Sequence, residues 1–215
     1  MNFFYSTLIV FFIISIACSN QNNKNAKNIS YAEKNNIAKS CIALNDSAVN
    51  LLNKYYVEDS NPAKLDIILD LLNESISCDT NFYLAYNNKI TVLSLKGEYL
   101  KVVNLLNKML EFSNNNPQLI FFKGMAYEKL KDYPSAEIAY KQAAVEYEKR
   151  LQLHPDSLII ITDKLFFTAF TEGKDQAIAE LKEYVLKYPN NTMLKEYQFI
   201  FETYHRDDFM FQHGK

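Results

Sequence analysis

The chain has 215 residues, enough for one or two domains, and its four glycines and five prolines predict a helical protein without glycine-rich phosphate loops. Lys and Arg number 23 against 25 for Asp and Glu, so the net charge of −2 provides no field of one sign for nucleic acid. Three histidines and three cysteines, widely spaced, argue against a zinc ribbon or a dense disulfide scaffold.

Residues 3–17 form an apolar run that ends at Cys18. A membrane-spanning helix needs about 20 residues, so the run fits the hydrophobic part of a signal peptide over residues 1–17. The sequence Ser15-Ile16-Ala17-Cys18 resembles the lipobox of bacterial lipoproteins, which implies a palmitate-type lipid on Cys18. Two alternatives stay open. An ordinary signal peptidase would cut the same bond and leave Cys18 unmodified, and an uncut run would anchor the chain.

A polar segment follows, with seven asparagines between residues 19 and 36 and few apolar side chains. Such a segment buries too little surface to offset its chain entropy. We therefore expect a disordered polar tether over residues 18–37, and a folded domain over residues 38–215. The alternative is a frayed terminus without a tethering role.

From about residue 40 onward, apolar residues recur at helical spacing between short polar breaks. The segment from Gly124 to Ala143 resembles the tetratricopeptide repeat (TPR). The matching residues lie on the first helix, at the turn and on the second helix: Gly124, Ala126, Tyr127, Asp132, Tyr133, Ala136, Tyr140 and Ala143. Lys131 stands at the turn position where the family has glycine.

The same turn recurs one repeat period earlier at Gly97, and one period before that at Ala63. The next turn, near Gly173, comes later than the period requires by about two helical turns, which lengthens the second helix of the third repeat, from Pro134 to about His154. We predict repeats near 49–82, 83–116, 117–157 and 158–191, and a capping helix from Met193 to about His205. The expected fold is all-α, a right-handed α-solenoid whose concave face is built from the first helix of each repeat.

The resemblance also implies which positions line the concave groove. Six of these are the candidate partner-binding residues: Asn87, Thr91, Phe121, Met125, Phe166 and Phe170. The last four predict an exposed apolar patch on the C-terminal half of the groove, suited to a protein partner. The alternative is that the C-terminal helix covers this patch with Tyr197, Phe201 and Tyr204.

Two further sets of residues carry structural predictions. Cys41 and Cys78 lie on either side of a turn near Asn61, at similar distances from it, so an exported chain could join them in a disulfide. The alternative is two small buried residues. Lys89, Lys123 and Lys164 share one repeat position, and we expect their stems to follow a ridge with the ammonium groups in solvent.

The predicted function is a non-enzymatic protein-interaction scaffold on a bacterial envelope, at the outer membrane and facing the periplasm. A partner protein or peptide of unspecified identity would bind through the groove. The alternative is a glycan-binding or small-ligand-binding lipoprotein in which Phe166 and Phe170 stack on sugar rings. No catalytic residue, metal site or cofactor is predicted, since His205, Asp207, Asp208 and His213 fall in a terminal tail.

Overall fold

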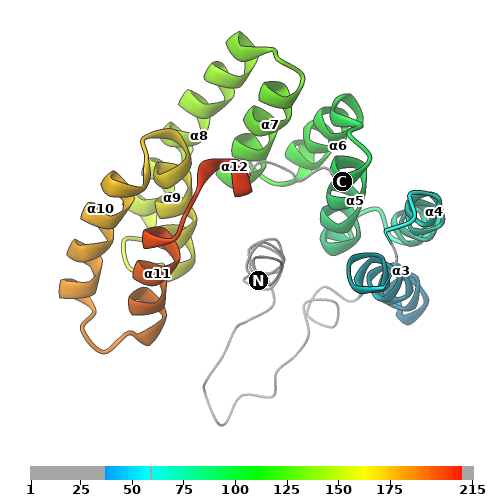
Figure 1. The fold of residues 1–215 in the computed structure, drawn as a ribbon, viewed down its shortest axis with the longest axis horizontal. Coiled ribbons are helices and arrows are strands. Elements are labelled where there is room, and N and C mark those ends of the chain that lie inside the picture. Colours follow the sequence, from blue (N-terminus) through cyan, green and yellow to red (C-terminus); the bar gives the residue numbers. More distant parts are fainter. Residues whose placement is uncertain (1–36, 59, 210–215) are drawn as a thin grey trace. The chain divides into compact units, whose positions relative to one another are not determined.

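The computed structural model describes residues 37–58 and 60–209, and they form two compact units, residues 37–105 and residues 106–209. The predicted signal peptide, Cys18 and all of the predicted tether except Ile37 lie outside the described residues. Ile37 itself is buried. Throughout the described ranges the regular structure is helical, which confirms the predicted all-α class (Figure 1).

The first unit contains α3 (Lys39–Val57), α4 (Ala63–Cys78), α5 (Tyr83–Leu95) and the start of α6 (Tyr99–Phe112). Helix α4 packs against both α3 and α5. The first repeat begins at α3 and not at residue 49, so the predicted boundary was wrong. The reason is that a buried residue recurs every three or four positions from the start of α3: Cys41, Asn45, Ala48, Leu52 and Tyr55.

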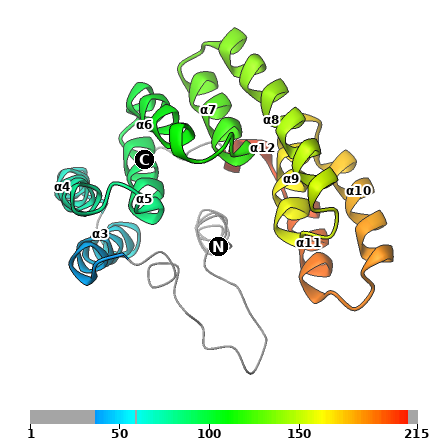
Figure 2. The same cartoon turned by 180° about the vertical axis from the view of Figure 1, so that it is seen from behind.

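The second unit contains the rest of α6 and continues with α7 (Pro117–Lys129), α8 (Tyr133–Leu153), α9 (Leu158–Thr171) and α10 (Lys174–Lys187). It ends with α11 (Thr192–Glu202) and α12 (Arg206–Phe209). Helices α7 to α11 pack in chain order, each against the next, as helical hairpins (Figures 1 and 2). The long second helix of the third repeat was predicted correctly, because α8 runs for 21 residues.

Polar side chains begin three of these helices by accepting a hydrogen bond from a free backbone N–H of the first turn. The pairs are Asn116 with the N–H of Gln118, Asp132 with that of Ser135, and Asn191 with that of Leu194. Prolines in the first turns of α7 and α8 reinforce these starts, since the ring fixes a helical φ.

Helix α11 corresponds to the predicted capping helix, and its buried residues are Leu194, Tyr197 and Phe201. Helix α12 was not predicted, because residues 206–209 were assigned to a solvated tail. Among the helices of residues 37–209, none combines the length and the apolar character that crossing a membrane requires.

Candidate interaction surfaces

The first unit keeps polar side chains accessible on the first helices of its repeats. Asn50 on α3 is exposed, and Asn53 on α3 is half-buried, as are Asn87 and Thr91 on α5. We call these four residues the amide face. Asn87 and Thr91 are four positions apart and share one side of α5, where the Thr91 hydroxyl donates to the carbonyl of Asn87 at 3.2 Å.

A buried hydrogen bond fixes the two helices of the amide face to each other. The Asn88 side-chain nitrogen donates to the Asn45 side-chain oxygen at 2.8 Å, and both residues are buried. A buried polar pair of this kind sets the register between helices, because shifting either one would leave an amide unpaired. The amide face therefore has a rigid base.

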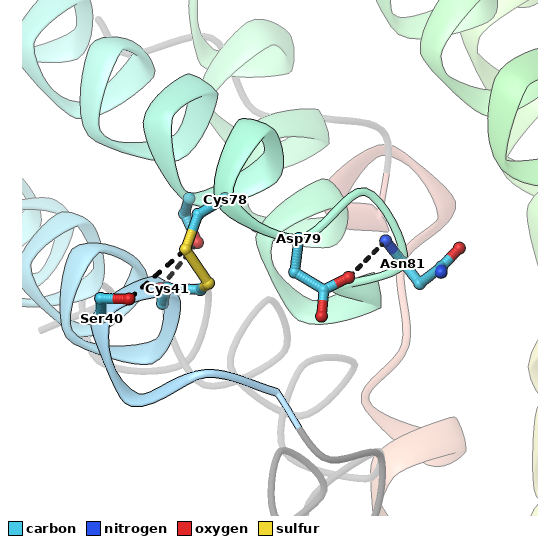
Figure 3. Close-up of a disulfide and its surroundings, with 6 residues drawn as sticks. Ser40, Cys41, Cys78, Asp79 and Asn81 are labelled. Atoms are coloured by element: carbon cyan, nitrogen blue, oxygen red, sulfur yellow. Dashed lines mark hydrogen bonds between the residues drawn. A yellow bond between two sulfur atoms is a disulfide. The ribbon is translucent and has the colours of Figure 1, made fainter.

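The structure joins Cys41 and Cys78, the pair predicted from the sequence, in a disulfide (Figure 3). Cys41 lies in the first turn of α3 and Cys78 is the last residue of α4, so the bond closes the open end of this helical hairpin. The buried Ser75 hydroxyl donates to the carbonyl of Cys41 at 2.8 Å and adds a second link between the helices.

In the second unit, the predicted exposed patch is buried, so that prediction was wrong. Phe121, Met125 and Phe170 are each 2% exposed, and Phe166 is 7% exposed. With α11 and Arg206 of α12 in place, these side chains are not available to a partner. Phe166 and Phe170 are therefore not exposed for stacking on a sugar ring, which removes the observation behind the glycan-binding alternative.

Aromatic side chains from α7, α9 and α11 pack against one another and bury Phe121, Phe166 and Phe170. The Phe121 ring on α7 lies 5.2 Å from Phe170 and 5.4 Å from Phe167, both on α9, in edge-to-face contacts. The Phe166 ring lies 5.4 Å from Tyr197 and 5.1 Å from Phe201, both on α11. The alternative given in the sequence analysis, that the C-terminal helix covers the patch, is therefore correct for Phe166.

A polar cluster of three side chains, Arg206, Glu128 and Tyr140, lies beside the Phe170 ring, and the sequence did not reveal it. The Arg206 guanidinium on α12 donates to both carboxylate oxygens of Glu128 on α7, at 2.9 and 2.8 Å. Its Nε donates to the carbonyl of Phe170 at 3.0 Å, and its Cζ lies 4.0 Å from the centre of the Phe170 ring. The Tyr140 hydroxyl on α8 donates to Glu128 at 2.8 Å. No local pattern could connect Arg206 with Glu128, which lies 78 positions away.

The cluster shifts the titration of its acidic members. Burial by itself would raise the pKa of Glu128, but the hydrogen bonds from Arg206 and Tyr140 and the Arg206 charge lower it below the ordinary value. Burial and the hydrogen bond to Glu128 raise the pKa of Tyr140. Glu128 is therefore an anion and Tyr140 a neutral donor at neutral pH.

The three repeat-related lysines have partners; the bonds of Lys89 and Lys123 are exposed, as predicted for ammonium groups at the surface, whereas the side chain of Lys164 is only 19% exposed. Each lysine on a first helix reaches a residue 16 positions earlier, on the second helix of the preceding repeat. The pairs are Lys89 with Asn73 at 2.6 Å, Lys123 with Asn107 at 3.2 Å, and Lys164 with Glu148 at 3.3 Å. This recurrent bridge links neighbouring repeats, and we assign the lysines a structural role.

One carboxyl group of the second unit has a strongly altered titration. Burial raises the pKa of Asp163, on α9, to about 7, and the charge of Arg150 opposes that shift only in part. The side chain of Asp163 thus changes its protonation near neutral pH.

No group of three His, Cys, Asp or Glu side chains able to hold a metal ion occurs among the residues that the structure describes. The Asp208 side chain and His213 lie outside them.

No family model matches the sequence, and no curated protein matches it either. Among solved structures, the chain is similar to a tetratricopeptide repeat protein from Parabacteroides merdae ATCC 43184, whose crystal structure has 2.39 Å resolution. The identity is 16%, the match covers 76% of this chain and 73% of that chain, and the TM-score is 0.44. The helical-hairpin fold follows from the packing described above and does not depend on this similarity.

Proposed function

We propose that the chain is a non-enzymatic scaffold that binds another protein, and that a lipid on Cys18 holds it at a bacterial membrane. The apolar residues 3–17, the lipobox-like Ser15–Cys18 and the polar segment after them support the anchor. The helical hairpins support the scaffold, since stacked hairpins present long rigid surfaces to partners.

The amide face of the first unit is the observation that carries the binding proposal. An asparagine side chain offers an acceptor and two donors, the same groups that a peptide backbone needs to satisfy its own C=O and N–H. Asn50, Asn53 and Asn87 therefore suit an extended peptide segment of a partner, held through its main chain. The buried Asn45–Asn88 bond keeps the two helices in place, which limits the entropy lost on binding.

Site-specific photo-crosslinking in cells tests this surface. A photoreactive side chain replaces Asn87 in one variant and Asn104, an exposed asparagine on α6, in a control variant. We expect a light-dependent adduct with one partner protein from position 87 and none from position 104. The substitution Asn53→Ala in the same chain should weaken the adduct. Identical adducts from both positions, or none from position 87, would contradict the proposed surface.

Fractionation of the same cells tests the anchor. Wild-type protein should sediment with membranes, and its mature N-terminus should carry an acyl mass on Cys18. Cys18→Ala should release the chain, whereas the neighbouring control Ser19→Ala should not. A Cys18→Ala variant that stays in the membrane without detergent would refute lipid anchoring.

A further inference from the structure

The polar cluster of Arg206, Glu128 and Tyr140, together with the Phe170 ring, has the features of a binding site for an arginine side chain. The guanidinium of Arg206 uses three of its N–H groups, two on Glu128 and one on the carbonyl of Phe170, while its flat face lies over the Phe170 ring. Paired bonds to a carboxylate combined with stacking on a ring require the planar fork of arginine. The point charge of a lysine cannot reproduce this set.

The acceptor side of this site is built from α7, α8 and α9 and does not need α12 for its position. The Tyr140 hydroxyl holds Glu128 at 2.8 Å, and the Tyr140 ring packs 5.8 Å from the Phe170 ring. Gly124 leaves room for the Tyr140 ring, because a Cβ there would come within 2.4 Å of it. The carboxylate and the ring thus have contacts that do not involve the guanidinium.

The present occupant of the site, Arg206 of α12, is more exposed than the buried side chains of the helix before it. Helix α11 is anchored by buried aromatic side chains, including Tyr197 and Phe201. Helix α12 has four residues, and the Arg206 side chain is 43% exposed, while that of Glu128 is only 17% exposed. Departure of α12 would leave the core covered by α11 and would leave a largely buried carboxylate without its cation.

We propose that Glu128, Tyr140 and Phe170 form an arginine-binding site that the chain's own Arg206 closes, and that an arginine side chain of a partner protein takes its place. This inference rests on the proposed scaffold function, and it adds a second, chemically defined contact outside the amide face. The partner segment that binds here carries an arginine whose guanidinium replaces that of Arg206 on the same acceptors.

Calorimetric titration of the full chain in detergent tests the site with two probes, acetyl-Gly-Arg-Gly-amide and acetyl-Gly-Lys-Gly-amide. We expect Arg206→Ala to bind the arginine probe at least tenfold more tightly than the lysine probe. Wild-type protein should bind the arginine probe at least tenfold more weakly than Arg206→Ala, since Arg206 competes. Adding Glu128→Gln to the open variant should abolish the preference. If Arg206→Ala does not fold, Arg206→Lys replaces it as the test variant, because lysine keeps a cation beside Glu128.

Equal affinity of the open variant for both probes would overturn the site, and equal affinity of wild type and open variant for the arginine probe would overturn closure by Arg206. Failure of this inference can be distinguished from failure of the scaffold proposal, because the titration needs no natural partner. A partner captured at position 87 without arginine selectivity would overturn this inference alone. Selectivity without any captured partner would support the site and contradict the scaffold.

Discussion

Equivalent positions of the two units carry opposite chemistry. Asn87 and Thr91 on α5 are followed one repeat period later by Phe121 and Met125 on α7, at the same positions of the next repeat. The first pair is half-buried and polar, whereas the second pair is buried within an aromatic cluster. The repeat register therefore decides which side of a helix a residue occupies. Whether that side is exposed depends on the segment that covers it.

The covering segment differs because, among the described residues, the second unit has two helices after its last hairpin, α11 and α12. Phe166 on α9 contacts Tyr197 and Phe201 of α11, and the Phe170 ring lies under Arg206 of α12. A terminal repeat must bury its open apolar side, and here aromatic side chains do so. The polar face of the first unit has no such requirement, which makes it the better candidate for contact with a partner.

The largest expected effect follows from removing a ring of the aromatic cluster. Phe166→Ala should lower the free energy of unfolding by about 3–5 kcal/mol, since it removes a buried ring and leaves a cavity between α9 and α11. Asn87→Ala in the first unit should change it by less than about 0.5 kcal/mol. Urea unfolding followed by far-UV circular dichroism measures both values.

Phe199→Ala is the matched control within the second unit, because Phe199 lies on α11 and is 60% exposed. We expect that variant to stay within about 0.5 kcal/mol of wild type. A small effect of Phe166→Ala would show that α11 does not cover α9 in solution, and it would restore the exposed-patch interpretation.

The second prediction concerns the disulfide, which stabilises the first unit only. Breaking Cys41–Cys78 releases a loop with a sequence separation of 37, and the chain-entropy relation gives a loss of about 3–4 kcal/mol. The double variant Cys41→Ala/Cys78→Ala should speed amide hydrogen exchange in α3 and α4. Exchange in α9 and α10 should be unchanged. Equal acceleration in both units would show that they unfold together.

Much of the fold could be predicted from the sequence because the same repeat pattern occurs several times along the chain. The turn near Gly97 and the extended helix ending near His154 follow from the period that the resemblance to the TPR implies. The capping helix, predicted from Met193 to about His205 because a terminal repeat needs a cover, corresponds to α11. The resemblance to the TPR placed Phe121 and Phe166 on an apolar face of the groove and predicted that this face is exposed, but both side chains are buried.

Coverage of that face could not be predicted, because it depends on contacts between distant segments. The one local signal was the apolar stripe of Tyr197, Phe201 and Tyr204, which supported a covering helix as an alternative. Arg206 gave no signal at all. Its partners Glu128 and Phe170 lie 78 and 36 positions away, and a lone arginine after a helix is usually solvated.

The third prediction is a pH dependence that belongs to the second unit. The pKa of Asp163 is raised from an ordinary value of 3.8 to about 7 in the folded state. Between these two pH values the folded chain therefore keeps a proton on Asp163 that the unfolded chain has lost. Stability from this group is therefore full below pH 4 and falls as the pH rises to 7. Asp163→Asn removes the charge and should raise the free energy of unfolding at pH 8 by about 1–2 kcal/mol.

Urea midpoints at pH 4 and pH 8 check this prediction. The two chains should differ little at pH 4, where Asp163 is protonated in the folded state. Asp175→Asn, on α10, is the control, and it should change neither midpoint appreciably. A destabilised Asp163→Asn variant at pH 8 would mean that the attraction between the Asp163 and Arg150 charges outweighs the cost of burial.

The smallest expected change in stability comes from exchanging residues between two equivalent turns, one in each unit. Gly97 and Lys131 occupy the same turn position of successive repeats, and both end a first helix in the left-handed region, with φ of 70° and 62°. The bonds around them correspond. The backbone N–H groups of Gly97 and Lys131 donate to the backbone carbonyls of Ser94 and Glu128, respectively. The next N–H groups, of Glu98 and Asp132, donate to the backbone carbonyls of Leu93 and Tyr127. This is the helix ending that glycine favours, since a Cβ crowds the neighbouring carbonyl at positive φ.

Exchanging the residues of these two turns should therefore move the stability of the two units in opposite directions. Lys131→Gly should stabilise the second unit by about 0.5 kcal/mol, a gain reduced by the greater freedom of glycine in the unfolded chain. Gly97→Lys should destabilise the first unit by about 1 kcal/mol. Urea midpoints of the two single variants test the pair, and effects of the same sign would show that side-chain contacts, rather than backbone conformation, decide which residue suits each turn.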